Sequence, residues 1–306
     1  MSKADFKILT IDGGGSKGIY ALGILFEIEK KLKSPLVDHF DAFYGTSTGA
    51  IIAAMLAKGK SVADIKKIYI EKIPTVMSAQ NKSKQLKVVL EGEFKNEMAD
   101  VFKKFVGIVA TSMDEKTPKI FKSSIDAAHK TQSSFVPFFG CSVVDALMAS
   151  CSAVPFFERA YLRNDEMQFS LIDGGFCANN PTLFAIIDAL KSFKKNPHDV
   201  VVINVGTGEF PKKETLHEKI INLLPLAPAR FFMDMLEISS NTTAFITKAL
   251  FSENMKLLRI SDPCTDPSLA TNLLEKDPSK LEKLFLKGKT SFREKEDEFQ
   301  KIFSGL

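Results

Sequence analysis

Residues 40–57 read FDAFYGTSTGAIIAAMLA. The apolar start is typical of a short buried strand, the glycine-bounded middle of a tight turn, and Ala50 to Ala57 of a buried helix. A Gly-x-Ser-x-Gly turn between a strand and a helix is the context of a nucleophile elbow. Gly45 and Gly49 allow a sharp turn that exposes the Ser47 hydroxyl at the helix N-terminus, where the helix dipole favours developing negative charge. Ser47 is therefore the candidate nucleophile.

A second glycine turn lies upstream, where residues 12–18 read DGGGSKG after the apolar stretch Phe6 to Ile11. Consecutive glycines leave backbone N–H groups uncovered, so such a loop can bind a phosphate or the oxyanion of a tetrahedral acyl intermediate. Asp12 begins this motif and Lys17 adds positive charge to it. The candidate oxyanion-hole residues are Gly13, Gly14, Gly15 and Gly18.

A third turn, Asp173-Gly174-Gly175, follows the strand-like stretch Phe169 to Ile172. A carboxylate at the carboxyl edge of a parallel sheet lies where ligands bind in such folds. Paired with Ser47, Asp173 could take the serine proton during attack and return it to the leaving alcohol. Gly174 and Gly175 are supporting motif residues, and an ordinary Asp-Gly turn is the competing interpretation of Asp173 taken alone.

Histidine is the usual base for a catalytic serine, and the chain has four. His39 and His198 each precede a strand, which places them at the wrong end of the sheet, and His129 lies in an irregular stretch. His217 alone could complete the Ser–Asp–His order of α/β-hydrolases. Its surroundings, KKETLHEK, are typical of an exposed helix start, so we expect it to play no catalytic part.

Composition limits the class of protein. The 306 residues are 45% hydrophobic and 25% charged, which excludes disorder for the bulk of the chain. No apolar run approaches the ~18–20 residues of a membrane span, and the N-terminus has no signal-peptide pattern. Four scattered cysteines exclude a disulfide framework or a CxxC metal site. We therefore expect a cytoplasmic protein that holds no metal.

Short apolar strands alternate with helical patterns, which predicts an α/β fold with a mainly parallel central sheet flanked by helices. We expect a catalytic core over residues 1–210 and a mainly helical C-terminal part over 211–306, packed on the same domain. Residues 61–135 are lysine-rich and less periodic, so we expect an insertion or lid there. Pro278 to Phe303 has the pattern of an exposed terminal helix.

Two compositional features bear on the substrate. The lysines between residues 58 and 104 are either a solvated helix face or a surface that meets anionic lipid. Phenylalanine is plentiful, with 26 residues, and several could line an acyl channel, although apolar side chains more often belong to the core. The candidates for the channel are Phe135, Phe138, Phe139, Phe156, Phe157, Phe231 and Phe232.

Taken together and in this order, the three motifs resemble those of the patatin-like phospholipase family. The stretch ASCSAVPFF at residues 149–157 is similar to a stretch of that family, and the resemblance covers roughly residues 6–208. It implies a three-layer α/β fold and hydrolysis of glycerophospholipid acyl esters without metal or calcium. Ser47 is then the nucleophile, Asp173 the base of a histidine-free dyad, and the glycines of residues 13–15 the oxyanion donors.

The run DGGFCANNPTLF at residues 173–184 and the Gly-Thr-Gly turn at 206–208 resemble bacterial phospholipase effectors of antiviral defence. In that subgroup a cyclic dinucleotide such as cyclic GMP–AMP (cGAMP) activates membrane degradation. The resemblance implies no required cofactor, a cyclic-dinucleotide activator, membrane phospholipids as substrate, peripheral association with the inner membrane, and a homo-oligomer. The motifs name no residues for the activator, and a net charge of +4 gives no reason to expect a nucleic-acid polymer.

Three other interpretations stay open. A constitutive patatin-like lipase would need no nucleotide. A sugar kinase of the actin-like fold also begins with an Asp-Gly-Gly-Gly phosphate loop, although that fold has no reason to carry a Gly-x-Ser-x-Gly elbow. A catalytically silent nucleotide sensor would keep its function in a Ser47→Ala variant.

Overall fold

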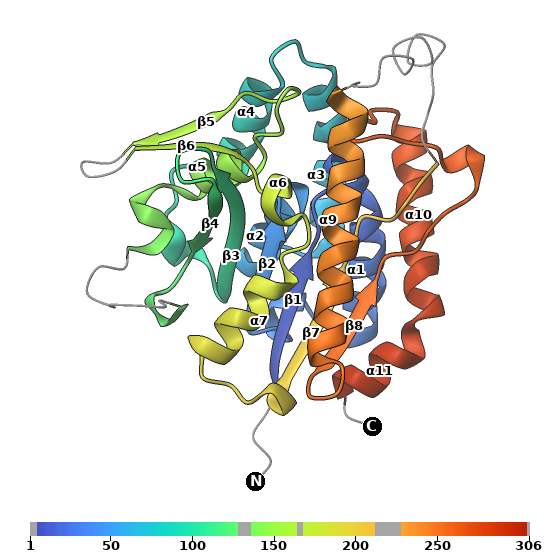
Figure 1. Ribbon diagram of the computed structural model, residues 1–306. Coiled ribbons are helices and arrows are strands. Elements are labelled where there is room, and N and C mark those ends of the chain that lie inside the picture. Colours follow the sequence, from blue (N-terminus) through green and yellow to red (C-terminus); the bar gives the residue numbers. More distant parts are fainter. Residues whose placement is uncertain (1–4, 128–135, 164–167, 212–227, 305–306) are drawn as a thin grey trace.

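One mixed sheet organises the fold, with the strand order β5-β6-β3-β2-β1-β7-β8 and with β4 paired to β3 (Figure 1). The computed structural model describes residues 5–127, 136–163, 168–211 and 228–304. The strands in these ranges are β1 (Phe6–Ile11), β2 (Ala42–Thr46), β3 (Phe105–Ser112), β4 (Thr117–Lys122), β5 (Ala160–Arg163), β6 (Gln168–Asp173), β7 (Val200–Val205) and β8 (Lys256–Ile260).

The centre of the sheet is parallel. Strands β3, β2, β1, β7 and β8 all run in one direction, whereas β4 and β6 pair antiparallel to β3, and β5 antiparallel to β6. Every residue of β7 is buried, as expected of a parallel strand that is covered on both faces. The predicted α/β fold with a mainly parallel sheet is confirmed.

Helices cover both faces of the sheet (Figure 1). In β1, Leu9 and Ile11 pack into the core formed with α1 and α2, while Ile8 packs into a second core formed with α7. None of the helices in the described ranges is long and apolar enough to cross a membrane. Their bounds are α1 (Gly18–Leu32), α2 (Thr48–Lys58), α3 (Val62–Ser78), α4 (Lys82–Phe94), α5 (Val143–Ser150), α6 (Gly175–Ala178), α7 (Thr182–Lys191), α9 (Pro228–Phe251), α10 (Pro278–Glu294) and α11 (Glu296–Ser304).

Residues 61–135 differ from the expected insertion or lid. They supply α3 and α4, but also β3, which lies inside the sheet with β4 on one side and with β2 and β6 on the other. The apolar strand at Phe105–Ser112 is almost wholly buried. It was not predicted from the sequence because the surrounding stretch is rich in lysine. Several of those lysines pair with acids on the same surface, such as Lys58 with Glu97 at 2.5 Å and Lys60 with Glu93 at 2.8 Å.

The C-terminal part also differs from the expected exposed helix. It contributes the sheet strand β8, and α10 packs closely against α1, with Leu281, Leu284 and Phe285 buried. A Cβ atom built on Gly288 of α10 would lie 2.0 Å from the carbonyl oxygen of Tyr20 in α1. The helix that follows the glycine loop is therefore held in place by a helix from the far end of the chain.

We expect Gly288→Ala to lower the free energy of unfolding by about 1–3 kcal/mol, because the added methyl group forces α1 and α10 apart. Gly92→Ala in α4 is the matched control, since nothing lies within 4 Å of its Cβ position. There the same change should raise stability by up to about 1 kcal/mol through helix propensity. Urea unfolding of both variants measures the difference, and an equal effect at the two positions would contradict the close helix packing.

Candidate active site

Ser47 lies at a strained turn between β2 and α2. Its backbone has φ 54° and ψ −124°, a conformation that side-chain-bearing residues rarely adopt outside functional sites. A Cβ atom on Gly45 would lie 2.4 Å from the Cα of Ala50, and one on Gly49 would lie 2.2 Å from the carbonyl oxygen of Ile11. Both flanking positions therefore require glycine. The observed backbone has the sharp strand-to-helix turn that the sequence predicts.

Ser150, at the end of α5, holds this turn from below. Its Oγ accepts a hydrogen bond from the N–H of Ser47 at 2.8 Å and donates one to the carbonyl oxygen of Val109 at 2.6 Å. The side chain is fully buried. Sequence reasoning did not assign it a role, because it stands outside the three glycine motifs and 103 residues from Ser47.

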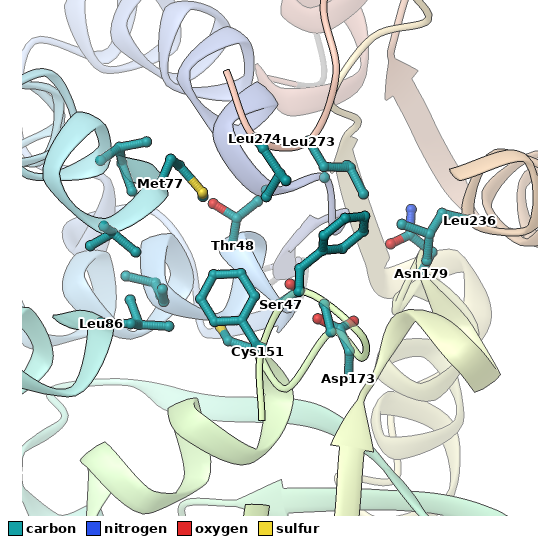
Figure 2. A pocket seen from close by; sticks show the side chains of 18 residues that line it. Ser47, Thr48, Met77, Leu86, Cys151, Asp173, Asn179, Leu236, Leu273 and Leu274 are labelled. Atoms are coloured by element: carbon teal, nitrogen blue, oxygen red, sulfur yellow. The ribbon is translucent and has the colours of Figure 1, made fainter. Parts of the chain in front are cut away.

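Asp173, the last residue of β6, is only 2% exposed and lines the same pocket as Ser47. Figure 2 shows the two side chains directed toward one another at one end of a pocket. Asp173 Oδ1 also accepts a hydrogen bond from the N–H of Gly175 at 2.7 Å. Burial raises the pKa of Asp173 to about 6, although the neighbouring Ser47 side chain and the hydrogen bond from Gly175 act in the opposite direction. At neutral pH the carboxylate is therefore ionised and able to accept a proton.

The prediction that Asp173 ends a parallel strand was wrong, since β6 is antiparallel to β3. Strand β4 occupies one side of β3 along residues 107–112, so β2 and β6 share the other side. Val109 of β3 pairs with Thr46, and the next residue, Ala110, pairs with Asp173. The ends of β2 and β6 therefore meet along β3, and this register places Asp173 beside Ser47.

The glycine loop offers fewer free donors than expected. The N–H of Gly13 donates to the carbonyl oxygen of Asn179 at 2.9 Å, and that of Gly18 donates within the first turn ahead of α1. These two glycines therefore do not fit the predicted oxyanion-hole role, because their N–H groups already donate hydrogen bonds within the fold. For Gly14 and Gly15, the part of the chain that the structure describes supplies no acceptor. Both line the same pocket as Ser47.

Asp12 and Lys17 support the loop from outside that pocket. The buried Asp12 carboxylate accepts hydrogen bonds from Arg259 at 2.8 Å and from the Asn204 side chain at 2.9 Å. The Lys17 Nζ lies 3.6 Å from Glu237 Oε1, so its charge is partly neutralised. Neither Arg259 nor Asn204 was singled out from the sequence, where no motif connects them to Asp12.

Apolar side chains form the walls of the pocket above Ser47 (Figure 2). The free volume is about 50 Å³, well below the ~300–1,000 Å³ of typical small-molecule sites, so a long acyl chain can enter only if a wall moves. Leu236 of α9 and Leu273 and Leu274 from the loop before α10 are part of the wall. Its other apolar members are Ile51, Ile73, Val76, Met77, Leu86, Ala153, Phe156 and Phe157.

The expected phenylalanine channel is only partly observed. Phe156 and Phe157 line the pocket, whereas Phe138 and Phe139 pack against Phe121 in the core. Apolar burial explains the latter pair without a channel. Phe135 lies outside the described residues, and the side chains of Phe231 and Phe232 are not described.

The remaining titratable groups near the site complete its electrostatics. Cys151 lines the pocket beside Ser47, and burial together with the nearby Asp173 raises the pKa of its thiol well above the usual range, so the thiol stays neutral. His39 and His198 lie away from the pocket, at the opposite ends of β2 and β7. His129 and His217 lie outside the described residues. Within those ranges no group of three or more His, Cys, Asp or Glu residues could hold a metal ion.

Residues 9–186 match the family described as patatin-like phospholipase. A cUMP-AMP-activated phospholipase of Escherichia coli is 40% identical over 303 residues, which are 97% of this chain and 93% of that protein. The chain belongs to the patatin-like phospholipase family. A cGAMP-activated phospholipase of Escherichia coli strain TW11681 is 26% identical over 230 residues, 68% of this chain and 63% of that protein. Membership places the chain among the lipid acyl hydrolases, an assignment that the sugar-kinase alternative does not fit.

A solved structure shares the fold at low identity. Human GIVD cytosolic phospholipase A2 in complex with methyl gamma-linolenyl fluorophosphonate superposes with a TM-score of 0.53. The match covers 99% of this chain and 59% of that chain, at 9% sequence identity. The patatin-like phospholipase fold of this chain thus extends through residues beyond 186, where the family match ends.

We expect Asp173→Asn to stabilise the protein at pH 8. The folded pKa of about 6 lies above the ordinary value of about 3.9, so the contribution of this group is favourable below pH 4 and is lost as pH rises through 6. Removing the charge should raise the free energy of unfolding at pH 8 by up to about 3 kcal/mol, at about 1.4 kcal/mol per pKa unit. Urea unfolding at pH 4 and pH 8 measures this, and an equal gain at both would refute a buried, ionised Asp173.

Proposed function

We propose that the protein hydrolyses acyl esters of membrane glycerophospholipids by a Ser47–Asp173 dyad, and that a cyclic dinucleotide switches it on. The observation that carries the proposal is that the Ser47 side chain faces the buried Asp173 carboxylate in a pocket with apolar walls. A serine on a strained elbow, a base within hydrogen-bonding reach and free backbone donors nearby are the parts that acyl transfer requires.

The first half of the reaction forms an acyl-enzyme. Ser47 Oγ attacks the ester carbonyl carbon while its proton passes to Asp173. The oxygen of the tetrahedral intermediate takes the negative charge and accepts hydrogen bonds from the N–H groups of Gly14 and Gly15. The bond to the leaving oxygen then breaks, and Asp173 returns the proton so that lysophospholipid leaves as a neutral alcohol.

The second half releases the fatty acid. Water attacks the acyl carbonyl, its proton passes to Asp173, and the same N–H groups stabilise the second tetrahedral intermediate. Collapse of this intermediate breaks the bond to Ser47 Oγ, which recovers its proton from Asp173. The dyad ends as it began, and Asp173 accepts or donates the proton in every step.

Likeness to activated relatives supports the regulatory half of the proposal. The relative that is 40% identical over 97% of this chain is named for activation by cUMP-AMP, and a more distant one for activation by cGAMP. The narrow pocket is consistent with a resting state that needs a signal. On the same grounds we propose a cytoplasmic role in antiviral defence, with action at the inner membrane surface and with assembly into a homo-oligomer.

We expect Ser47→Ala and Asp173→Ala each to lower fatty-acid release from phospholipid vesicles by at least ~10³-fold, because each removes one partner of the proton transfer. His217→Ala should leave the rate within about twofold and serves as the control for a histidine-free dyad. Fatty-acid release at saturating nucleotide measures all three variants, with circular dichroism to establish folding. A folded His217 variant with a large rate loss would favour a triad instead.

We expect release from the wild-type protein to rise at least tenfold when cyclic UMP–AMP or cyclic GMP–AMP is added. The physical reason is that the resting pocket is too narrow for an acyl chain, so a signal must widen it. The measurement compares vesicles with and without each nucleotide, and Ser47→Ala corrects for background. Serine-dependent release at the same rate without nucleotide would identify a constitutive lipase.

A further inference from the structure

A second cavity, larger than the active-site pocket, lies among β7, β8, α9 and α11. Its volume is about 410 Å³, within the ~300–1,000 Å³ that small-molecule sites occupy. Figure 1 shows α9 running alongside β7 and β8, with α11 near the start of β8. The lining is mixed, with aliphatic residues on the strands and with hydroxyl, amide and charged side chains around them. None of the catalytic motifs borders this cavity.

One polar group in the cavity wall lacks a partner. The hydroxyl of Thr247 in α9 is buried, with the residue 6% exposed, and it makes no hydrogen bond to any residue that the structure describes. A buried hydroxyl without a partner is costly and uncommon in folded proteins, so it calls for an explanation. A ligand that fills the cavity and bonds to Thr247 removes the cost.

The charges around the cavity favour an anion. Lys248, Arg259 and Lys295 line it, against the single carboxylate of Glu298. Lys295 is paired with Glu298 at 2.9 Å, and Arg259 contacts Asp12, whereas Lys248 is exposed at the rim. Two phosphodiesters are the anionic groups of a cyclic dinucleotide, and lysine and arginine are their usual partners in proteins.

An aromatic side chain stands where a base could stack. Phe245, two residues before Thr247 and three before Lys248 on α9, lines the cavity yet is 74% exposed. A phenyl ring left in water is available for stacking on a nucleobase, an interaction worth about 1–3 kcal/mol per base.

We propose that this cavity is the binding site of the activating cyclic dinucleotide, an inference that rests on the proposed function. The phosphates contact Lys248 and Arg259, one base stacks on Phe245, and the Thr247 hydroxyl gains its missing partner. The site thus combines anion recognition, stacking and polar readout, which are the three elements that distinguish a nucleotide from a lipid headgroup.

Helix α9 connects this cavity to the active site. Leu236, in the first half of the helix, forms part of the wall above Ser47, and Thr247 lies eleven residues later, about 17 Å along the same helix axis. A shift of the helix caused by ligand at Thr247 therefore moves Leu236. A second connection runs through Arg259, which lines the cavity and bonds to Asp12 at the start of the glycine loop.

Calorimetric titration of cyclic UMP–AMP and cyclic GMP–AMP into the Ser47→Ala protein tests the site. We expect one of them to bind, and we expect Lys248→Glu and Thr247→Val to weaken its Kd at least tenfold. Lys283→Glu, an exposed lysine on α10, is the matched control and should leave the Kd unchanged. Because the Thr247 hydroxyl has no partner among the described residues, Thr247→Val should not lower the thermal midpoint, which separates lost binding from unfolding.

The outcomes separate this inference from the proposed function. Binding that is weakened by both cavity variants but not by the control supports the site. Binding of unchanged affinity in both variants overturns the cavity assignment and leaves activation by a nucleotide intact. Binding of neither nucleotide overturns both, although Ser47-dependent lipid hydrolysis would still stand.

Discussion

The active centre depends on two strands whose ends meet along a third. Strand β2 arrives at Thr46 and β6 arrives from the other direction at Asp173, and both pair with neighbouring residues of β3. Hydrogen bonds of the sheet therefore set the separation of Ser47 and Asp173, which are 126 positions apart by their residue numbers. A one-residue slip of β6 would turn the carboxylate to the other face of the sheet, so register is a condition of catalysis.

The residues around this pair hold an unfavourable backbone conformation at Ser47 and a buried charge at Asp173. The unfavourable backbone of Ser47 is held by Ser150 and by the glycines that let α2 approach β1 and β2. Burial makes the Asp173 carboxylate costly when ionised, and that cost gives it a pKa suited to accepting a proton near neutral pH. Both features lower the free energy of unfolding, and both serve the chemistry of the site.

Local features of the site could be predicted from the sequence, and long-range ones could not. The elbow at Ser47 and the turn at Asp173 could be predicted because each contains glycines, which the close approach of neighbouring backbone requires. The direction of β6 could not be read from six residues, and the strand β3 was obscured by neighbouring lysines. Gly13 and Gly18 were assigned as donors because a sequence does not show which N–H groups the fold already uses.

The order in which the chain is synthesised has a consequence for the glycine loop. Asp12 is held by Arg259, which follows it by 247 residues, and the N–H of Ser16 donates to the carbonyl oxygen of Leu273 at 2.9 Å. Helix α1, which continues the loop, is packed by α10, which comes later still. Because a chain emerges from the ribosome with its N-terminal segments first, the loop acquires these supports only after Arg259, Leu273 and α10 have been synthesised. A nascent lipid hydrolase of this kind therefore has an incompletely supported oxyanion loop until those residues have emerged.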